Sequence, residues 1–311
     1  MKSVVTGVAG FIGSHLAEEL VQKGHQVVGI DSFTEFYPRQ MKENNLFTLQ
    51  NKKEFRLVEG RLQDLNLGQV LSGADYIFHL AAQAGVRTSW GENFTDYVDN
   101  NIVATQALLE LCKKLRLKKL VYASSSSVYG EVDELPMRED TKLSPISPYG
   151  VTKLAAEQLS SVYHRNYRIP IVILRYFTVY GPRQRPDMAF YRFLRAAISG
   201  EAIVVYGDGS QTRDFTYISD AVKATLAAAE KGKAGKVYNV GGGNRVSLKE
   251  TLGLIEQVVG EKLKVKWDDF HRGDMHHTYA DTTKAQRELH FVPQVELEVG
   301  IKQQYQWMLS A

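Results

Sequence analysis

Short apolar runs alternate with amphipathic stretches through the first half of the chain. The apolar runs lie at 3–7, 26–31, 55–60, 76–82, 119–125 and 171–177. Apolar residues recur at helical spacing over 11–24, 101–115 and 149–167. Strands and helices that alternate in this way predict an α/β fold, a doubly wound parallel sheet of the Rossmann type. In such a sheet, ligands bind in a crevice at the carboxyl ends of the strands.

The pattern becomes irregular after about residue 177. Charged, loop-rich segments such as 180–188 and 206–214 follow, and helical patterns return over 188–199, 219–230 and 247–259. We therefore predict two domains. The first is a Rossmann domain over 1–177, and the second is a smaller C-terminal α/β domain over 178–311 that is partly interleaved with the sheet.

Composition narrows the class of protein. The 311 residues are 44% hydrophobic and 23% charged, which is ordinary for a soluble globular protein. A net charge of +3 gives no reason to expect binding to nucleic acid or to a membrane. The single cysteine, Cys112, lies in an apolar-periodic stretch, so we expect a buried residue and a reducing, cytoplasmic location. We expect no secretory signal and no transmembrane span, and we assign no residue to a metal site.

Three glycines, Gly7, Gly10 and Gly13, follow the first predicted strand and open the first helix. Such a turn lets the backbone approach a pyrophosphate at the helix N-terminus. Asp31 ends the second predicted strand, where it can accept from the ribose hydroxyls of an adenosine. No basic residue follows at 32–34, and the carboxylate would repel a 2′-phosphate, so NAD is favoured over NADP. A tight turn beside a solvated aspartate is the alternative without a ligand.

Tyr149 and Lys153 are four residues apart on a predicted helix and share one face. Ser147 suits the N-cap and Pro148 the first turn. The ammonium and the helix dipole both favour the phenolate, so we expect a lowered pKa for Tyr149 and a base active near neutral pH. Alone, the pair would be an ordinary surface Tyr and Lys. A Ser-rich stretch at 123–130, at the end of a predicted strand, favours a catalytic site instead.

Taken together, these motifs resemble the extended short-chain dehydrogenase/reductases of the NAD-dependent nucleotide-sugar epimerase and dehydratase family. The matching segments span nearly the whole chain in family order. They are TGVAGFIGSHL (6–16), HLAAQAGVR (79–87), DNNIVAT (99–105), ASSSSVYG (123–130), SPYGVTK (147–153), RYFTVYGPRQRPDMA (175–189), VYGDGSQTRDFTYISD (205–220) and VYNVGGG (237–243). The resemblance implies a tightly bound, recycled NAD in the first domain and a nucleotide sugar in the second. It also implies a homodimer through the helices near 101–115 and 149–167.

The resemblance further implies roles for individual residues. The catalytic set is Ser125, Tyr149 and Lys153. The cofactor contacts are Gly7, Gly10, Phe11, Ile12, Gly13, Asp31, Ser32, Leu62, Ala81, Ala82, Asn101, Tyr149, Lys153 and Tyr176. The contacts to the uracil and diphosphate are Tyr206, Arg213, Arg272 and Asp274. Two departures stand out, because Arg61 replaces the family's frequent acid near the adenine and the usual Arg-x-Gly-Asp is one residue shorter here.

Within the family, segments 36–46, 85–90 and 177–190 look most like UDP-glucuronate 4-epimerases. The resemblance implies C4 epimerisation of UDP-glucuronate to UDP-galacturonate through a transient 4-keto intermediate, with Tyr149 as the base. That intermediate is a β-keto acid and tends to lose carbon dioxide, so the enzyme must hold the carboxylate at fixed geometry. The candidate donors are Arg185, Thr178, Ser126, Ser127 and Arg87.

Several alternatives remain open. UDP-glucose/UDP-galactose 4-epimerases often carry Asn where this chain has Thr178. UDP-glucuronate decarboxylases share an arginine in the same loop but usually carry an acid at the position of Ser127. Arg185 could instead bind the diphosphate. Outside enzymes, the fold could serve as a non-catalytic sensor of NAD or a nucleotide sugar, against which the intact set of Ser125, Tyr149 and Lys153 argues.

Overall fold

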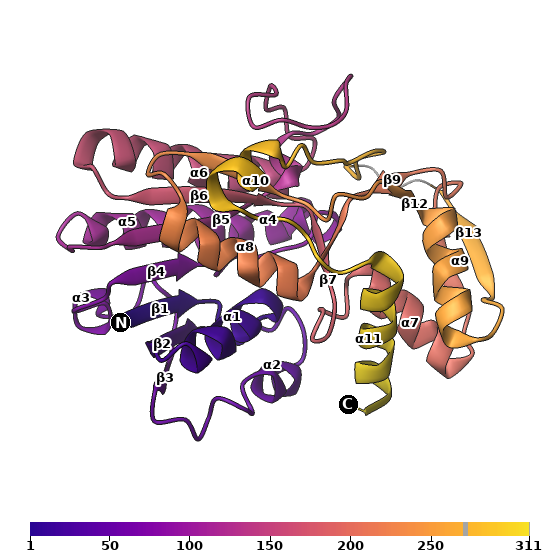
Figure 1. Cartoon of the computed structure of the whole chain (residues 1–311), viewed down its shortest axis with the longest axis horizontal. Coiled ribbons are helices and arrows are strands. Elements are labelled where there is room, and N and C mark those ends of the chain that lie inside the picture. Colours follow the sequence, from indigo (N-terminus) through magenta and orange to yellow (C-terminus); the bar gives the residue numbers. More distant parts are fainter. Residues whose placement is uncertain (270–272, 311) are drawn as a thin grey trace.

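A seven-stranded parallel sheet forms the centre of the computed structural model, which describes residues 1–269 and 273–310 (Figure 1). Its strand order is β11-β6-β5-β4-β1-β2-β3. The strands are β1 (Lys2–Thr6), β2 (Gln26–Asp31), β3 (Phe55–Glu59), β4 (Tyr76–His79), β5 (Lys119–Ser125), β6 (Ile171–Tyr176) and β11 (Val237–Val240). The order reverses between β1 and β4, which places a ligand crevice at their carboxyl ends. The predicted doubly wound sheet is confirmed.

Helices cover both faces of this sheet, and further helices belong to the C-terminal half. The α-helices are α1 (Phe11–Gln22), α2 (Arg39–Asn45), α3 (Leu67–Val70), α4 (Phe94–Tyr97), α5 (Ala104–Cys112), α6 (Pro148–Tyr167), α7 (Ala189–Ser199), α8 (Ile218–Lys231), α9 (Leu248–Val259), α10 (Thr283–Leu289) and α11 (Leu297–Ser310). In Figure 1, α1 and α8 lie side by side on one face, and α5 and α6 pack on the other. Among the described residues, no helix has the length and apolar character that crossing a membrane requires.

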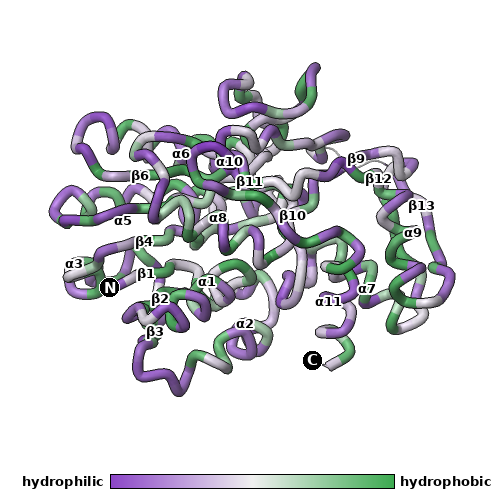
Figure 2. Tube along the Cα trace, in the orientation of Figure 1, coloured by the Kyte–Doolittle hydropathy of each residue, from purple (hydrophilic) through white to green (hydrophobic). Residues whose placement is uncertain are grey.

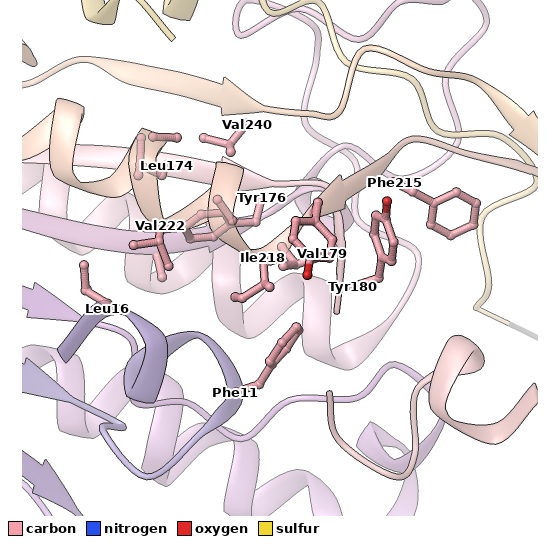
Figure 3. Close-up of a cluster of buried hydrophobic side chains, with 14 of the residues drawn as sticks. Phe11, Leu16, Leu174, Tyr176, Val179, Tyr180, Phe215, Ile218, Val222 and Val240 are labelled. Atoms are coloured by element: carbon pink, nitrogen blue, oxygen red, sulfur yellow. The ribbon is translucent and has the colours of Figure 1, made fainter. Parts of the chain in front are cut away.

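The strands alternate their side chains between two apolar layers. Val5 packs with α1 and α8, whereas its neighbour Val4 packs with α5 and α6. Because both faces are covered, the central strands are apolar at nearly every position, which explains the runs in the sequence. Figure 3 shows the first layer, where Phe11 and Leu16 of α1 lie opposite side chains of α8 and β6. Figure 2 shows the hydrophilic segment that leads into β3, an edge strand with a half-exposed pattern.

The C-terminal half contributes both to the main sheet and to a smaller group of elements. Three two-stranded sheets pair β7 (Thr178–Tyr180) with β10 (Phe215–Tyr217), β8 (Ile203–Tyr206) with β13 (Val265–Asp268), and β9 (Thr212–Arg213) with β12 (Val246–Ser247). Helices α7, α9 and α11 pack together, at the right of Figure 1. Strand β11 and helix α8, by contrast, complete the main sheet. The domain boundary at 177/178 stays a prediction.

Some elements differ from the sequence-based expectation. The helix predicted over 101–115 is divided, because Val98–Val103 form a π-helical segment and α5 ends at Cys112. Cys112 is buried between the sheet and its helices, as expected. The sequence reasoning did not assign α10 or α11, whose short or weakly amphipathic patterns gave little signal.

Candidate active site

A cavity of about 890 Å³ lies at the carboxyl edge of the sheet. Its walls come from the turn after β1, from the ends of β2, β4, β5 and β6, and from loops of the C-terminal half. It brings together nearly every residue singled out from the sequence. The exceptions are Asn101, which does not line the cavity, and Arg272, which lies outside the described residues. The predicted residues that line it are Gly7, Gly10, Phe11, Ile12, Gly13, Asp31, Ser32, Leu62, Ala81, Ala82, Arg87, Ser125, Ser126, Ser127, Tyr149, Lys153, Tyr176, Thr178, Arg185, Tyr206, Arg213 and Asp274.

The glycine turn has a shape that only glycine allows. Gly7 has a φ of +71°, and a Cβ there would lie 2.8 Å from the backbone nitrogen of Ala81. A Cβ on Gly13 would lie 2.1 Å from the carbonyl oxygen of Gly7. Helix α1 begins directly after Gly10, with no capping side chain and no acidic residue in its first turn. This leaves a helix N-terminus suited to an anion such as a pyrophosphate.

Asp31 holds this turn as well as facing the cavity. Its carboxylate accepts hydrogen bonds from the backbone N–H groups of Ala9 and Phe33, both at 2.9 Å. Burial raises the pKa of Asp31, and the two hydrogen bonds oppose that rise. The sequence argument about positions 32–34 missed Lys42, which is buried, lines the cavity and interacts electrostatically with Asp31. Lys42 lies on α2, eleven residues after Asp31, and reaches the site only through the fold. The residues directly after Asp31 therefore gave no sign of a cation there.

Leu62 and Arg61, which the sequence reasoning expected near an adenine, lie in one wall of the cavity. Leu62 is buried and lines the wall. Arg61 also lines it and pairs with Asp99, with Nη2 3.4 Å from Oδ2. The cation is therefore partly neutralised by a residue of the π-helical segment. On the other side of the site, Tyr176 presents its ring to the cavity while its hydroxyl is bonded to Thr225, 2.6 Å away.

Tyr149 projects from the start of α6 beside Ser125. The Ser147 hydroxyl caps this helix by accepting from the Gly150 N–H at 3.1 Å, as predicted. Tyr149 shares a hydrogen bond with Ser125. The Ser125 hydroxyl also donates to that of Ser127, 3.2 Å away. The hydroxyls at the end of β5 and the phenol of α6 thus meet in one place.

The expected fall in the Tyr149 pKa is wrong for this structure. Burial raises the pKa of Tyr149, and it outweighs the opposing effects of the Ser125 hydrogen bond and the Arg185 charge. Lys153 donates to the carbonyl oxygen of Ala123, and its nitrogen lies 4.7 Å from the centre of the Tyr122 ring. Burial lowers the pKa of Lys153 to about 7. Desolvation acts on both groups and was not weighed in the sequence argument.

Asn101 supports the site rather than lining it. Its side chain accepts from the Gln83 N–H at 2.7 Å and donates to the Gln83 carbonyl at 3.0 Å. It also donates to the Thr152 hydroxyl at 2.9 Å. Asn101 lies in the π-helical segment, a distortion often found at functional sites. It therefore ties the loop after β4 to the helix that carries Tyr149.

A second charged group faces Tyr149. Arg185 lines the cavity and interacts electrostatically with Tyr149, and Thr178, Ser126 and Ser127 line the cavity as well. Arg185 forms a bidentate pair with Asp187, with Nε and Nη2 at 2.9 and 2.8 Å from the carboxylate. The sequence reasoning missed Asp187, although an acid two residues after Arg185 in the same loop was a usable signal.

Arg87 lies with the residues assigned to the nucleotide, not with Arg185. Its guanidinium is 2.7 Å from the carboxylate of Asp274 and stacks 4.1 Å from the centre of the Tyr206 ring. This candidate for the sugar carboxylate therefore contacts Asp274 and Tyr206, which the sequence reasoning expected to contact the diphosphate and the uracil. Arg213 lines the same wall, and burial lowers its pKa while Asp274 opposes that effect. Arg192 of α7, which the sequence reasoning missed, also faces the Tyr206 ring at 5.8 Å.

Comparisons with known proteins place this arrangement in a family. Residues 3–241 match the sequence model of the NAD dependent epimerase/dehydratase family. A Bacillus subtilis (strain 168) protein named "Uncharacterized UDP-glucose epimerase YtcB" is 46% identical over 312 residues, covering 100% of this chain and 98% of its own length. A UDP-glucuronate 4-epimerase from Thermodesulfobacterium geofontis (strain OPF15) is 40% identical over 309 residues, covering 98% and 95%. A crystal structure of UDP-glucuronic acid 4-epimerase from Bacillus cereus, in complex with UDP-glucuronic acid and NAD, matches with a TM-score of 0.97 at 44% identity, covering 100% and 99%. The chain belongs to the NAD dependent epimerase/dehydratase family.

Proposed function

We propose that this protein is an NAD-dependent UDP-glucuronate 4-epimerase that interconverts UDP-glucuronate and UDP-galacturonate. The observation that carries the proposal is Arg185 facing Tyr149 in one cavity. A cation suited to a carboxylate then stands beside a tyrosine whose phenolate form, favoured by the Arg185 charge and the Ser125 hydrogen bond, can take the 4-hydroxyl proton. The Bacillus cereus relative, crystallised with UDP-glucuronic acid and NAD, supports the same assignment.

The residues at the β1 and β2 ends fit a dinucleotide. The glycine turn and the N-terminus of α1 would hold the pyrophosphate, and Asp31 would hold the adenosine ribose. When bound, NAD supplies the acceptor for the hydride from C4 and the donor that returns it. Since the hydride returns, the reaction has no net redox change and the cofactor stays bound.

The chain's own groups handle the proton and hold the sugar. As the phenolate, Tyr149 would accept the proton of the 4-hydroxyl. Ser125, which is hydrogen-bonded to Tyr149, would favour that phenolate and orient the hydroxyl beside it. The pair of Arg185 with Asp187 uses Nε and Nη2, so the N–H groups of Nη1 remain for a sugar carboxylate. Thr178 and Ser127 line the same cavity, and their hydroxyls would add hydrogen bonds to the carboxylate. Holding the carboxylate keeps its C–C bond out of alignment with the 4-keto π system, which opposes decarboxylation.

A second candidate, a 4-epimerase of UDP-glucose and UDP-galactose, is favoured by one observation. Asp187 already compensates the charge of Arg185, which lessens the need for a substrate carboxylate. The name of the Bacillus subtilis relative points the same way. A neutral sugar would then contact the pair of Arg185 and Asp187 through hydrogen bonds alone, without an ionic interaction.

The deciding experiment is a product assay without added NAD. The protein is incubated with UDP-glucuronate or UDP-glucose, and the products are followed by NMR. We expect UDP-galacturonate from UDP-glucuronate. A UDP-pentose as the main product would make the protein a decarboxylase, and turnover of UDP-glucose alone would establish the second candidate. No turnover with NAD still bound would support a sensor.

We further propose a cytoplasmic homodimer. The outer surfaces of α6 and the adjoining π-helical segment expose several large apolar side chains, which a second copy would cover. These residues are Val103, Val151, Val162 and Tyr167. Analytical ultracentrifugation tests the assembly, and charged substitutions at Val151 and Val162 should shift it to a monomer.

A further inference from the structure

Glu157 is a buried carboxylate on the catalytic face of α6. Tyr149, Lys153 and Glu157 follow one another at intervals of four residues, so they occupy successive turns of one face. The Glu157 side chain is only 2% exposed. Its role is not explained by the proton and hydride chemistry, because it does not line the cavity.

Consecutive residues at the end of β5 contact this face of α6. The Ala123 carbonyl accepts from Lys153. The Ser124 hydroxyl donates to Glu157 at 2.7 Å, and the Ser125 hydroxyl is bonded to Tyr149. Three consecutive strand residues therefore contact three consecutive turns of the helix. The contact of Ser124 with Glu157 lies next to the pair of hydroxyls that faces the substrate.

Arg175 of β6 anchors Glu157 from the other side. Its Nη2 and Nε lie 2.5 and 3.2 Å from the two carboxylate oxygens. Arg175 also donates to the Tyr129 hydroxyl at 2.9 Å, and that hydroxyl donates to Asn239 of β11 at 2.7 Å. The carboxylate is thus tied to two strands of the sheet and cannot move with α6 alone.

Glu157 also dominates the charge around Lys153. The titratable groups that face Lys153 are Tyr149 and Glu157 on α6, Tyr122 on β5 and His79 on β4. His79 is neutral, because burial lowers its pKa to about 3. Burial lowers the pKa of Lys153, and the charge of Glu157 opposes this. Among these four groups, Glu157 is the carboxylate and therefore the one that carries a negative charge near neutral pH.

We propose that Glu157 is a positioning residue for the catalytic pair. Held by Arg175, it fixes the end of β5 against α6 through Ser124 and places a buried negative charge one helical turn from Lys153. The kinetic part of this assignment rests on the proposed function, whereas its effect on Lys153 can be measured without turnover.

The test compares Glu157→Gln, which keeps the size and an acceptor but removes the charge, with Ser124→Ala, which keeps the charge but removes the contact. The Lys153 titration is read by ¹³C NMR of Cε-labelled lysine, assigned with Lys153→Met. In Glu157→Gln the midpoint should fall by about one pH unit, and the basic limb of the kcat profile should move with it. In Ser124→Ala the midpoint should stay, and kcat should fall about fivefold at every pH.

Removing one partner of a buried pair can unfold a protein, so the double variant Glu157→Gln/Arg175→Met provides a second route. Its Lys153 midpoint should also fall, but by less, because the cation of Arg175 is lost together with the carboxylate. Glu157→Asp, which retains the charge, should keep the midpoint near that of the wild type. An unchanged Lys153 midpoint in a folded variant without the carboxylate overturns the proposal. If no nucleotide sugar is turned over but the midpoint falls, the proposed function fails while the assignment of Glu157 stands.

Discussion

The two ends of the cavity are built in different ways. At the β1 and β2 end, the wall around the glycine turn is mainly backbone, with a helix N-terminus and an aspartate that accepts from two main-chain N–H groups. The charged side chains of Lys42 and Arg61 lie beside it. At the other end, the walls are charged side chains in pairs. Arg87 pairs with Asp274, 187 residues away, and Arg185 pairs with Asp187. One end imposes a fixed shape on a ligand, and the other presents compensated charges.

This difference indicates how amino-acid substitutions at each end should affect ligand binding. A fixed backbone shape fails when any atom intrudes, because packed backbone cannot give way. A compensated ion pair can exchange one partner for a ligand group, so its substitution alters which ligand binds. We therefore expect substitutions at the backbone end to affect every substrate alike, and substitutions at the charged end to separate one substrate from another.

The largest effect is expected where both ends meet, at Tyr149. Tyr149→Phe removes the base but keeps the ring, so kcat should fall about a thousandfold while the protein retains NAD. The matched control is Tyr163→Phe on the same helix, whose hydroxyl bonds Glu110 and Gln106 rather than the site. It should turn over like the wild type. Wild-type rates in Tyr149→Phe would remove Tyr149 from its role as the base.

The next largest effect tests the fixed shape of the backbone end. In Gly13→Ala the new Cβ would lie 2.1 Å from the carbonyl oxygen of Gly7, so the turn must move. Such overpacking costs about 1–3 kcal/mol, so the affinity for NAD should fall about tenfold to a hundredfold. Turnover of every substrate should be affected equally. Gly253→Ala in α9, where no atom lies within 4 Å of the added carbon, is the control and should bind NAD normally. Calorimetry with the NAD-stripped protein measures both.

The features that could be predicted from the sequence also differ between the two ends of the cavity. The strands and the glycine turn could be predicted because they depend on local pattern and on the conformational freedom of Gly7. The roles of Arg87 and Lys42 could not, since their partners are brought close only by the folded chain. The expected pKa of Tyr149 failed for a related reason. Helix position is visible in sequence, but the burial that raises the pKa is a property of the whole fold.

A smaller effect, confined to one substrate, is expected at the charged end. Arg185→Ala should raise the KM for UDP-glucuronate by about tenfold to a hundredfold, the worth of a charge-assisted hydrogen bond, and should leave UDP binding nearly unchanged. Asp187→Asn should act in the opposite direction and lower that KM, because it removes both a competitor for Arg185 and a repulsive charge. Steady-state kinetics with UDP-binding calorimetry measure the two effects. Equal losses of uronate and UDP binding in Arg185→Ala would reassign Arg185 to the diphosphate.

The smallest expected response concerns His79, which lies inside the backbone end. The Thr6 hydroxyl accepts from the N–H groups of Leu80 and Ala81, so its own proton points to Nδ1 of His79, 2.8 Å away. On the other side, the Thr105 hydroxyl donates to a backbone carbonyl and must accept from Nε2–H, 2.9 Å away. The partners therefore assign a neutral ring protonated at Nε2, linking the glycine turn to the π-helical segment.

We expect this ring to show no titration between pH 5 and 8. Burial lowers the pKa of His79 to about 3, below the value of about 6.5 in an unfolded chain. The sign of the linkage follows, because the unfolded chain binds the proton first as the pH falls. The contribution of neutral His79 to the free energy of unfolding is thus fully present above pH 6.5 and is lost as the pH falls toward 3. Long-range ¹H–¹⁵N NMR, assigned with His79→Gln, reads the tautomer directly. Thr105→Val removes the acceptor of Nε2–H, so it should perturb the ring resonances and lower the free energy of unfolding. A ring protonated at Nδ1, or one that titrates near neutral pH, would show that the hydroxyls of Thr6 and Thr105 do not fix His79 in this way.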